Sequence, residues 1–267
     1  MAGGIEWTEV TWNPITGCQQ VSPGCDHCYA LVLVNTRQVK NSLSPRFNHP
    51  FNEVMIHENR INQPAAIKKP SRIFVNSMSD VFHKDVPDAT IDAIFNVMDR
   101  VDRHTYQVLT KRSERMRRYL NKRYPTAPCP SHIWIGVSCE NSDYAWRVND
   151  LRNTNASLRW ISAEPLLGSL HAVNLDRIAW VVAGGESGRG ARPMDLDWVR
   201  ELRDRCVVAG VAYFLKQLGG ETKKRGKEEA VLDRMRWTQY PTIEEKGFVG
   251  EPRSVFYQPK LFDDVTK

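Results

Sequence analysis

The sequence lacks long apolar runs, an apolar leader and the regular cysteine spacing of a disulfide framework. No stretch of about 18 consecutive apolar residues occurs, which excludes a transmembrane helix. Residues 1–11 contain Glu6 and Glu9 and have no apolar core, so they do not resemble a secretory signal peptide. We therefore expect a cytoplasmic protein with no membrane partner, in which thiols stay reduced.

Low-complexity segments are also absent, whereas core-forming residues are plentiful. The 267 residues include eight Trp, nine Phe and eight Tyr, and 41% are hydrophobic, which argues against disorder over most of the chain. The formal net charge of +6 is a modest excess that suits a polyanionic partner but also many unrelated enzymes. Basic residues concentrate at 111–123 and 223–227, where the pattern fits either a solvated face or a nucleic-acid-binding surface.

Short apolar segments alternate with helical patterns along most of the chain. Strands are predicted at 73–75, 106–109, 133–137, 158–161, 178–182 and 211–215, and helices at 87–101, 113–120, 143–151 and 196–208. One more strand near the cysteines gives about seven β/α steps, typical of parallel sheets with right-handed crossovers. We predict an α/β fold, a full or partial (β/α) barrel with parallel strands in a single main domain. This domain covers residues 1–220 with an insertion near 31–71, and residues 221–267 form a C-terminal extension packed on it.

Polar or ionisable residues follow almost every predicted strand. Because the carboxyl ends of parallel strands form the active-site face of α/β folds, this repetition indicates an enzyme. The candidate residues are Ser77, Ser79, Asp80, Lys111, Ser138, Cys139, Glu164, Glu186 and Lys216. Glu164 and Glu186 are candidate acid–base or substrate-binding groups, and Cys139 is a candidate hydrogen-atom donor. Each has a structural alternative, such as a helix cap, a solvated lysine or a small buried thiol.

Three of the six cysteines, Cys18, Cys25 and Cys28, fall within eleven residues with the spacing C-x6-C-x2-C. Their loop contains a proline and a glycine and can direct three thiolates toward one point. Thiolates suit iron–sulfur clusters or zinc. Structural zinc sites and electron-transfer clusters normally take four protein ligands, so three ligands favour a cluster with one open iron.

Two other interpretations of the cysteine loop stay open. One is a zinc knuckle completed by His27 or by a distant residue, and the other is a packing role without metal. The remaining cysteines, Cys129, Cys139 and Cys206, are dispersed and are expected to behave mainly as small buried hydrophobes.

The segment Cys25–Ala30, which reads C-x-x-C-Y-A, resembles the radical S-adenosylmethionine (SAM) superfamily. Longer strings resemble a phage-type three-cysteine family within or beside it, and more distantly spore photoproduct lyases. These strings lie at 12–14, 17–18, 22–30, 76–80, 109–112, 134–138, 162–166 and 184–188. The usual spacing of the superfamily is C-x3-C-x2-C, and this sequence has three further residues between its first two cysteines.

The resemblance implies a 4Fe–4S cluster on Cys18, Cys25 and Cys28 whose open iron binds SAM, with reductive cleavage of SAM to act on a substrate. It implies contacts to SAM from the segment Ser77–Asp80, from Lys111 and from Ser138. Tyr29 belongs to the cysteine motif, and Lys216 adds a positive charge able to hold an anionic group. An electron donor is implied as a partner.

The expected substrate is DNA or RNA in repair or modification, and Phe47, Tyr144 and Trp146 are candidates to stack on bases. Two alternatives remain. One is an iron–sulfur enzyme that uses its open iron, or light-driven electron transfer, without SAM. The other is a zinc-stabilised nucleic-acid-binding module.

Overall fold

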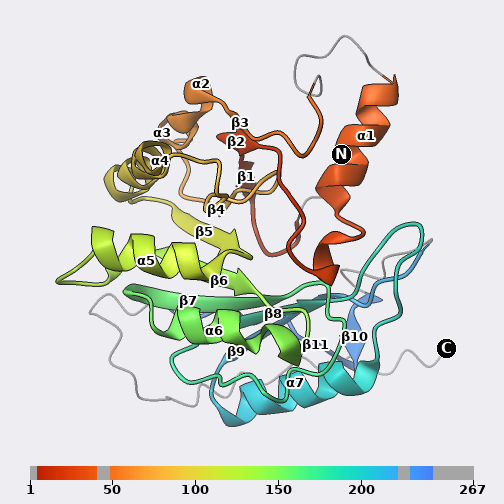
Figure 1. Ribbon diagram of the computed structural model, residues 1–267. Helices are drawn as coiled ribbons and strands as arrows, with labels where there is room; N and C mark the ends of the chain where they lie inside the picture. The colour runs from red at the N-terminus through yellow and green to blue at the C-terminus, as the bar shows by residue number, and fades with distance from the viewer. Residues whose placement is uncertain (1–4, 41–48, 222–228, 243–267) are drawn as a thin grey trace. The chain divides into compact units, whose positions relative to one another are not determined.

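The computed structural model describes residues 5–40, 49–221 and 229–242, and all elements named below lie in these ranges (Figure 1). The chain divides into two compact units. The first contains residues up to Ser138 together with Asn153–Leu158, and the second contains Cys139–Arg152 and the residues from Arg159 onward. The predicted insertion and C-terminal extension include residues 41–48, 222–228 and 243–267, which lie outside the described residues.

The first unit is built on parallel strands in the order β1 (Val10–Trp12), β4 (Arg72–Val75), β5 (Thr105–Thr110) and β6 (Cys129–Ser138). Its main helices are α1 (Tyr29–Lys40), α4 (Asp88–Arg100) and α5 (Ser113–Arg123). Two short strands, β2 (Ile15–Thr16) and β3 (Met55–Ile56), form an antiparallel pair, and the one-turn helices are η1 (Pro23–Cys25), α2 (Glu58–Ile61) and α3 (Gln63–Ala66).

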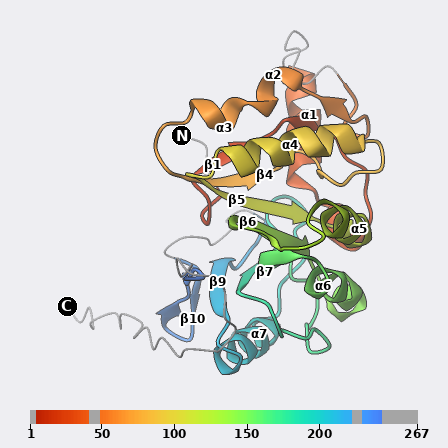
Figure 2. The same cartoon turned by 90° about the vertical axis from the view of Figure 1, so that its left-hand side faces the viewer.

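Helix α4 follows from its apolar stripe, and Ile91, Ile94, Phe95 and Met98 are all buried as the pattern predicts. Helices α4 and α5 lie side by side (Figure 2), with the rings of Phe95 and Tyr119 in contact at 5.5 Å between centroids. The Phe82 ring, from the loop after β4, packs against both. This aromatic cluster therefore supports the loop that leaves β4.

Successive residues of β5 point to opposite faces of its sheet. The Tyr106 hydroxyl donates to the carbonyl of Val101, directly after α4. The next residue, Gln107, points to the other face and donates from Nε2 to the carbonyl of Trp7. The Trp7 ring packs edge-on against Phe74. One face of β5 thus lies toward the end of α4, and the other lies toward the N-terminal segment that contains Trp7.

The second unit has the parallel strands β7 (Ala156–Ala163), β8 (Trp180–Gly184) and β9 (Ala212–Gln217) in that order. The first three residues of β7 belong to the first unit. The helices of the second unit are η3 (Ser142–Tyr144), α6 (Ala145–Arg152) and α7 (Leu196–Val208), and β10 (Val231–Leu232) pairs with β11 (Met235–Arg236). Its core holds Trp160 and Trp180, which are fully buried.

The prediction of an α/β fold with parallel strands is confirmed. Seven strands follow one another in the order β1-β4-β5-β6-β7-β8-β9, and β1 and β9 are its two ends in the described part of the chain, so the partial (β/α) barrel is the form observed. Cys129 and Cys206 are fully buried, as expected, and the six cysteines, all within the described residues, form no disulfide. Within the described residues, every helix is too short or too polar to cross a membrane.

Candidate functional site

The cysteine loop follows β1 and β2 and is fixed at Gly17 and Cys18. The amide of Gly17 donates to the carbonyl of Met78 at 3.0 Å, and the amide of Cys18 donates to the carbonyl of Phe51 at 2.7 Å. Gly17 has φ +88°, and a Cβ at this position would lie 1.8 Å from the carbonyl oxygen of Glu53. Only glycine allows this approach, because any side chain would collide with the neighbouring backbone.

The predicted residues Ser77 and Ser79 also hold this loop. Ser77 donates from Oγ to Oδ1 of Asn13 at 3.1 Å, and Ser79 donates from Oγ to the carbonyl of Gly17 at 2.6 Å. The amide of Met78 donates to the same Asn13 oxygen at 2.9 Å. The segment after β4 therefore positions the backbone that leads into Cys18.

Asp80 joins the ends of β4 and β5. Its carboxylate accepts hydrogen bonds from the Thr110 hydroxyl at 2.7 and 2.9 Å, from the Lys111 amide at 3.1 Å and from the Phe82 amide at 2.9 Å. The residue is 5% exposed, so these bonds replace the water that burial removes.

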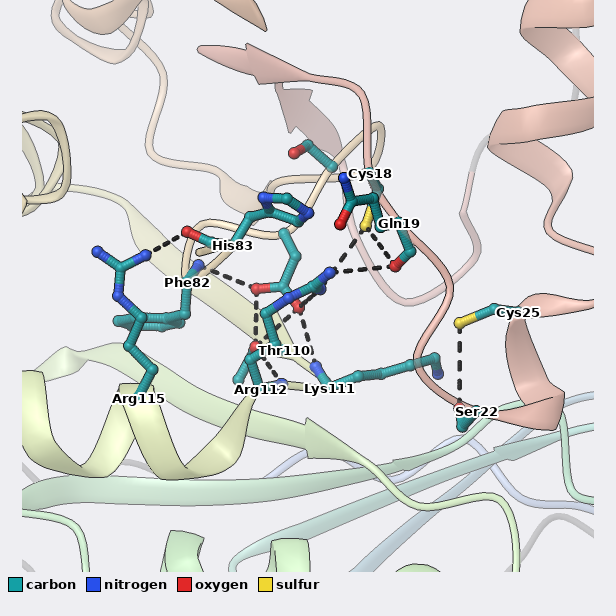
Figure 3. Close-up of polar contacts among 12 residues, drawn as sticks. Cys18, Gln19, Ser22, Cys25, Phe82, His83, Thr110, Lys111, Arg112 and Arg115 are labelled. Atoms are coloured by element: carbon teal, nitrogen blue, oxygen red, sulfur yellow. Dashed lines mark hydrogen bonds and ion pairs between the residues drawn. The ribbon is translucent and has the colours of Figure 1, made fainter. Parts of the chain in front are cut away.

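Arg112 connects Asp80 to the cysteine loop, and Figure 3 shows its guanidinium next to Cys18 and Gln19. Its Nη1 lies 2.9 Å from Oδ2 of Asp80 and 3.7 Å from Sγ of Cys18, and its Nη2 donates to the carbonyl of Gln19 at 3.1 Å. A single guanidinium thus binds a carboxylate, a sulfur and a backbone carbonyl at the carboxyl ends of three strands. Such a planar fork suits a buried charged group with several acceptors.

The charges around Cys18 oppose one another. Burial, and next the Asp80 carboxylate, raise the pKa of the Cys18 thiol to about 11, while the charge and hydrogen bond of Arg112 act in the other direction. Burial lowers the pKa of Arg112, but Asp80 and Cys18 outweigh it and the net shift is upward. The thiolate form of Cys18 therefore depends on positive charge, from Arg112 and from any metal that binds the sulfur.

Cys25 and Cys28 lie at the entry to α1. Cys25 ends the turn η1, with its sulfur 4.0 Å from the Ser22 hydroxyl, and the Cys28 carbonyl accepts the Val32 amide at 3.0 Å. Cys28 thus directly precedes the N-terminus of a helix, where negative charge is favoured. Tyr29 is 57% exposed, and its hydroxyl donates to the carbonyl of Ser77.

The donor chemistry of the loop fits a 4Fe–4S cluster. Three thiols are soft ligands, and in such a cluster each thiolate binds a different iron. Within the ranges that the structure describes, no three Cys, His, Asp or Glu side chains, the three cysteines of the loop included, are gathered closely enough to hold a metal ion. His27, considered above as a zinc ligand, is exposed in the turn between Cys25 and Cys28.

Two other predicted residues of the first unit lie at strand ends. Lys111 follows β5, and Figure 3 shows its side chain extended toward Cys25 and Ser22. Ser138 is the last residue of β6 and is 3% exposed. Their predicted contacts to SAM stay predictions.

The predicted residues of the second unit form two ion pairs and a buried thiol. Nζ of Lys216 lies 2.7 Å from Oε1 of Glu164, and the Glu186 carboxylate is bound by the backbone amide and guanidinium of Arg192 at 2.7–3.0 Å. Glu186 thereby fixes its own glycine-rich loop. Cys139 is fully buried, and its thiol lies 3.3 Å from the Asn141 carbonyl, which agrees with the alternative of a small buried thiol.

Sequence reasoning missed Arg112, Gly17 and Asn13 as parts of the site. Arg112 directly follows the predicted Lys111, so position after a strand was a signal for both. Gly17 precedes the first cysteine, where a glycine often marks close backbone approach. Asn13 belongs to the string 12–14 that resembles the phage-type family, but its role was not predicted, because its side-chain partners are more than sixty residues away.

A family model described as "Protein of unknown function (DUF5131)" matches residues 2–241. No curated protein matches the chain. Solved structures of spore photoproduct lyase are similar in fold. The enzyme complexed with dinucleoside spore photoproduct is 12% identical, with a TM-score of 0.44, and the match covers 76% of this chain and 62% of that one.

A mutant of the lyase with bound AdoMet and dinucleoside spore photoproduct is 11% identical, with a TM-score of 0.43 and coverage of 73% and 60%. This chain therefore spans about three-fifths of the length of these two structures. The match to the family model covers most of the chain, and the protein therefore belongs to the family "Protein of unknown function (DUF5131)".

Proposed function

We propose that this member of the family is a radical SAM-type iron–sulfur enzyme with Cys18, Cys25 and Cys28 as cluster ligands. The observation that carries the proposal is the attachment of the three-cysteine loop to the carboxyl ends of β4 and β5, through Asp80 and Arg112. This is the edge of a parallel sheet at which α/β enzymes place their catalytic groups.

The residues around the loop have distinct roles in this proposal. Ser77 and Ser79 position the backbone before Cys18, and Arg112 offsets negative charge on the Cys18 sulfur. Lys111 supplies an ammonium group for the SAM carboxylate, and Ser138 a hydroxyl. Held by the three cysteines, a 4Fe–4S cluster would supply the electron for the reductive cleavage of SAM and so the radical chemistry on the substrate. The protein orients these groups and excludes competing reactions.

Anaerobic reconstitution tests the proposal directly. The protein is incubated with iron and sulfide, and then with dithionite and SAM, and we expect iron and sulfide to be retained and 5′-deoxyadenosine and methionine to form. Replacing Cys18, Cys25 or Cys28 with Ala should each abolish both results. Cys206→Ala, a buried cysteine of the second unit, is the matched control and should retain the cluster. Full iron content in any of the three variants would dismiss that cysteine as a ligand.

The same preparation separates the alternatives. Bound zinc without sulfide would favour the zinc-stabilised nucleic-acid-binding module. A cluster without 5′-deoxyadenosine would favour an iron–sulfur enzyme that does not use SAM.

We propose a nucleic acid as the substrate class, supported by the net charge of +6 and by the basic helix α5. Part of this charge is used within the protein, because Arg115, Arg118 and Arg123 form ion pairs with Asp88, Glu114 and Asp92. Trp146 is 49% exposed and remains a candidate to stack on a base. Phe47 and the basic segment 223–227 lie outside the described residues.

In the second unit, we propose the Glu164–Lys216 pair as acid–base or substrate-binding groups. Both side chains are partly exposed, at 13% and 21%, and they share one short ion pair of 2.7 Å. A carboxylate and an ammonium group in contact can exchange a proton with a bound substrate. Glu186, whose carboxylate is bound by Arg192, is the weaker candidate.

A further inference from the structure

One cysteine of the loop has a charged hydrogen-bond donor beside its sulfur. Nη1 of Arg112 donates to Sγ of Cys18 at 3.7 Å. The Cys25 sulfur instead lies 4.0 Å from the Ser22 hydroxyl, which is a neutral group. Hydrogen bonds from a charged donor are roughly twice as strong as neutral ones. The sulfur of Cys18 therefore has a different electrostatic environment from that of Cys25.

The other bonds of Arg112 hold its guanidinium in this position. Nη1 also donates to Oδ2 of Asp80 at 2.9 Å, and Nη2 donates to the carbonyl of Gln19 at 3.1 Å. The Asp80 carboxylate is fixed in turn by the Thr110 hydroxyl and the Lys111 amide. The side chains of Arg112 and Asp80 are only 14% and 7% exposed, so water and salt screen their charges weakly.

Two opposite charges thus act on the Cys18 sulfur. The positive charge of Arg112 is in contact with the sulfur, and the negative charge of Asp80 is bonded to the same nitrogen. Coulomb interactions at such short range are large where water is excluded. Removing Arg112 or Asp80 breaks the same ion pair, but the two changes alter the electrostatic potential at the sulfur in opposite directions.

Reduction of an iron–sulfur cluster adds negative charge to the cluster and its ligands. Net charge, solvent exposure and hydrogen bonds to the sulfurs set its reduction potential. We propose that Arg112 and Asp80 set the reduction potential of the cluster through Cys18, with Arg112 raising the potential and Asp80 lowering it. The inference rests on the proposed function for the cluster, but it requires no cleavage of SAM. Both side chains act through the Cys18 sulfur and are positioning residues.

A potentiometric titration of the anaerobically reconstituted full chain tests this inference. Dithionite gives one electron to each cluster and is itself oxidised, no SAM is added, and the reduced cluster is measured by electron paramagnetic resonance. Arg112→Gln removes the positive charge and keeps a polar side chain. At the potential that half-reduces the unmodified protein, the ratio of reduced to oxidised cluster should fall about 10-fold in this variant, a shift of about 59 mV for one electron.

Asp80→Asn is the decisive second variant. It removes the negative charge, retains an oxygen for the Thr110 hydroxyl and breaks the same ion pair with Arg112. At the same solution potential, the ratio of reduced to oxidised cluster should rise in this variant. A merely structural role of the pair would shift the ratio in the same direction in Asp80→Asn and Arg112→Gln, because both variants loosen the same contact.

Two further variants separate the local charge from other effects. Arg112→Lys keeps the positive charge without the planar fork, so its potential should lie between those of Arg112→Gln and the unmodified protein. If Arg112→Gln holds no cluster, Arg112→Lys takes its place in the comparison with Asp80→Asn. Arg118→Gln is the matched control, because this arginine forms a pair with Glu114 that is 68% and 64% exposed. Solvent screens its charge, and the potential should not change.

The proposal requires opposite shifts in Arg112→Gln and Asp80→Asn. A shared direction, no shift in one or both, or an equal shift in Arg118→Gln would overturn it. Failure of the unmodified protein to bind a 4Fe–4S cluster would overturn both the inference and the proposed function. Opposite shifts in a cluster that forms no 5′-deoxyadenosine would overturn the proposed function alone. SAM cleavage with unshifted potentials would overturn this inference alone.

Discussion

At the scale of single residues, Arg112 balances the charges next to the cysteine loop. Its side chain is 14% exposed and that of Asp80 is 7% exposed, so Arg112→Leu leaves a buried carboxylate without its cation. Breaking such a pair costs about 3 kcal/mol of folding free energy. We expect this loss of unfolding free energy in urea denaturation. We also expect a lower iron content in the reconstituted Arg112→Leu protein. Arg118→Leu is the control, because its pair with Glu114 is 68% and 64% exposed and is worth less than about 1 kcal/mol. Equal losses in the two variants would contradict a special role for Arg112.

Gly17 provides a second test at this scale. Gly17→Ala places a Cβ against the Glu53 carbonyl, so the Cys18 amide must move away from Phe51. We expect a loss of about 2 kcal/mol or more in unfolding free energy, and a reconstituted protein with less iron. Gly188→Ala also acquires a side chain at positive φ, +104°, but with nothing within 4 Å, so only the conformational cost of about 1 kcal/mol applies. A Gly17→Ala protein with full iron content would show that the cysteine loop does not need the close contact between Gly17 and the Glu53 carbonyl.

Sequence reasoning identified many of these residues but not their partners. Ser77, Ser79 and Asp80 were predicted from their position after a strand, and the structure places all three around the start of the cysteine loop. The sequence alone did not identify Arg112, because the contact between Arg112 and Cys18 joins residues that are 94 positions apart in the chain. Spacing along a sequence reports local geometry, whereas such contacts depend on how strands are ordered in the sheet.

At the scale of elements, the packing of α4 supports the loop after β4. The Phe95 ring contacts Phe82 and Tyr119, and the Phe82 amide donates to Asp80. Phe95→Ala should therefore cost about 3–5 kcal/mol in urea denaturation. Val208→Ala, at an 88% exposed position ending α7, should cost less than about 0.5 kcal/mol. Similar values for the two would mean that the aromatic cluster does not hold this region together.

Element boundaries were predictable where one periodic signal dominates. The apolar stripe of residues 196–208 gave the bounds of α7, because one face is consistently buried. The helix predicted at 143–151 is instead the turn η3 followed by α6, since the Asn141 side chain accepts the Asp143 amide and begins a 3-10 turn. Strand β6 starts at Cys129, earlier than predicted, because its first residues alternate in burial without an apolar pattern.

At the scale of the whole molecule, the arrangement of charge bears on the proposed substrate. The net charge is +6, but many arginines are bound to carboxylates within their own unit, among them Arg112, Arg123 and Arg192. Such pairs stabilise loops and contribute little to an external field. The number of phosphates that the protein can neutralise is therefore smaller than its count of basic residues, which the sequence alone does not reveal.

The salt dependence of nucleic-acid binding tests this view of the charges. If nucleic acid is the substrate class, binding measured by fluorescence anisotropy should weaken as salt rises, with a log–log slope of about −0.9 for each phosphate contacted on DNA. Lys122 is exposed on α5, and Lys122→Ala should remove about one phosphate contact. The log–log slope should then be shallower by about 0.9.

Arg115, on the same helix as Lys122, is the control variant. Its guanidinium already binds Asp88 and the carbonyls of His83 and Val86, so we expect it to contact no phosphate. Arg115→Ala should lower stability and leave the slope unchanged. An identical change of slope in both variants would show that an arginine in an internal ion pair still contacts the phosphates of the nucleic acid. An affinity for nucleic acid that does not change with salt concentration would contradict nucleic acid as the substrate class, because contacts to phosphates release counterions.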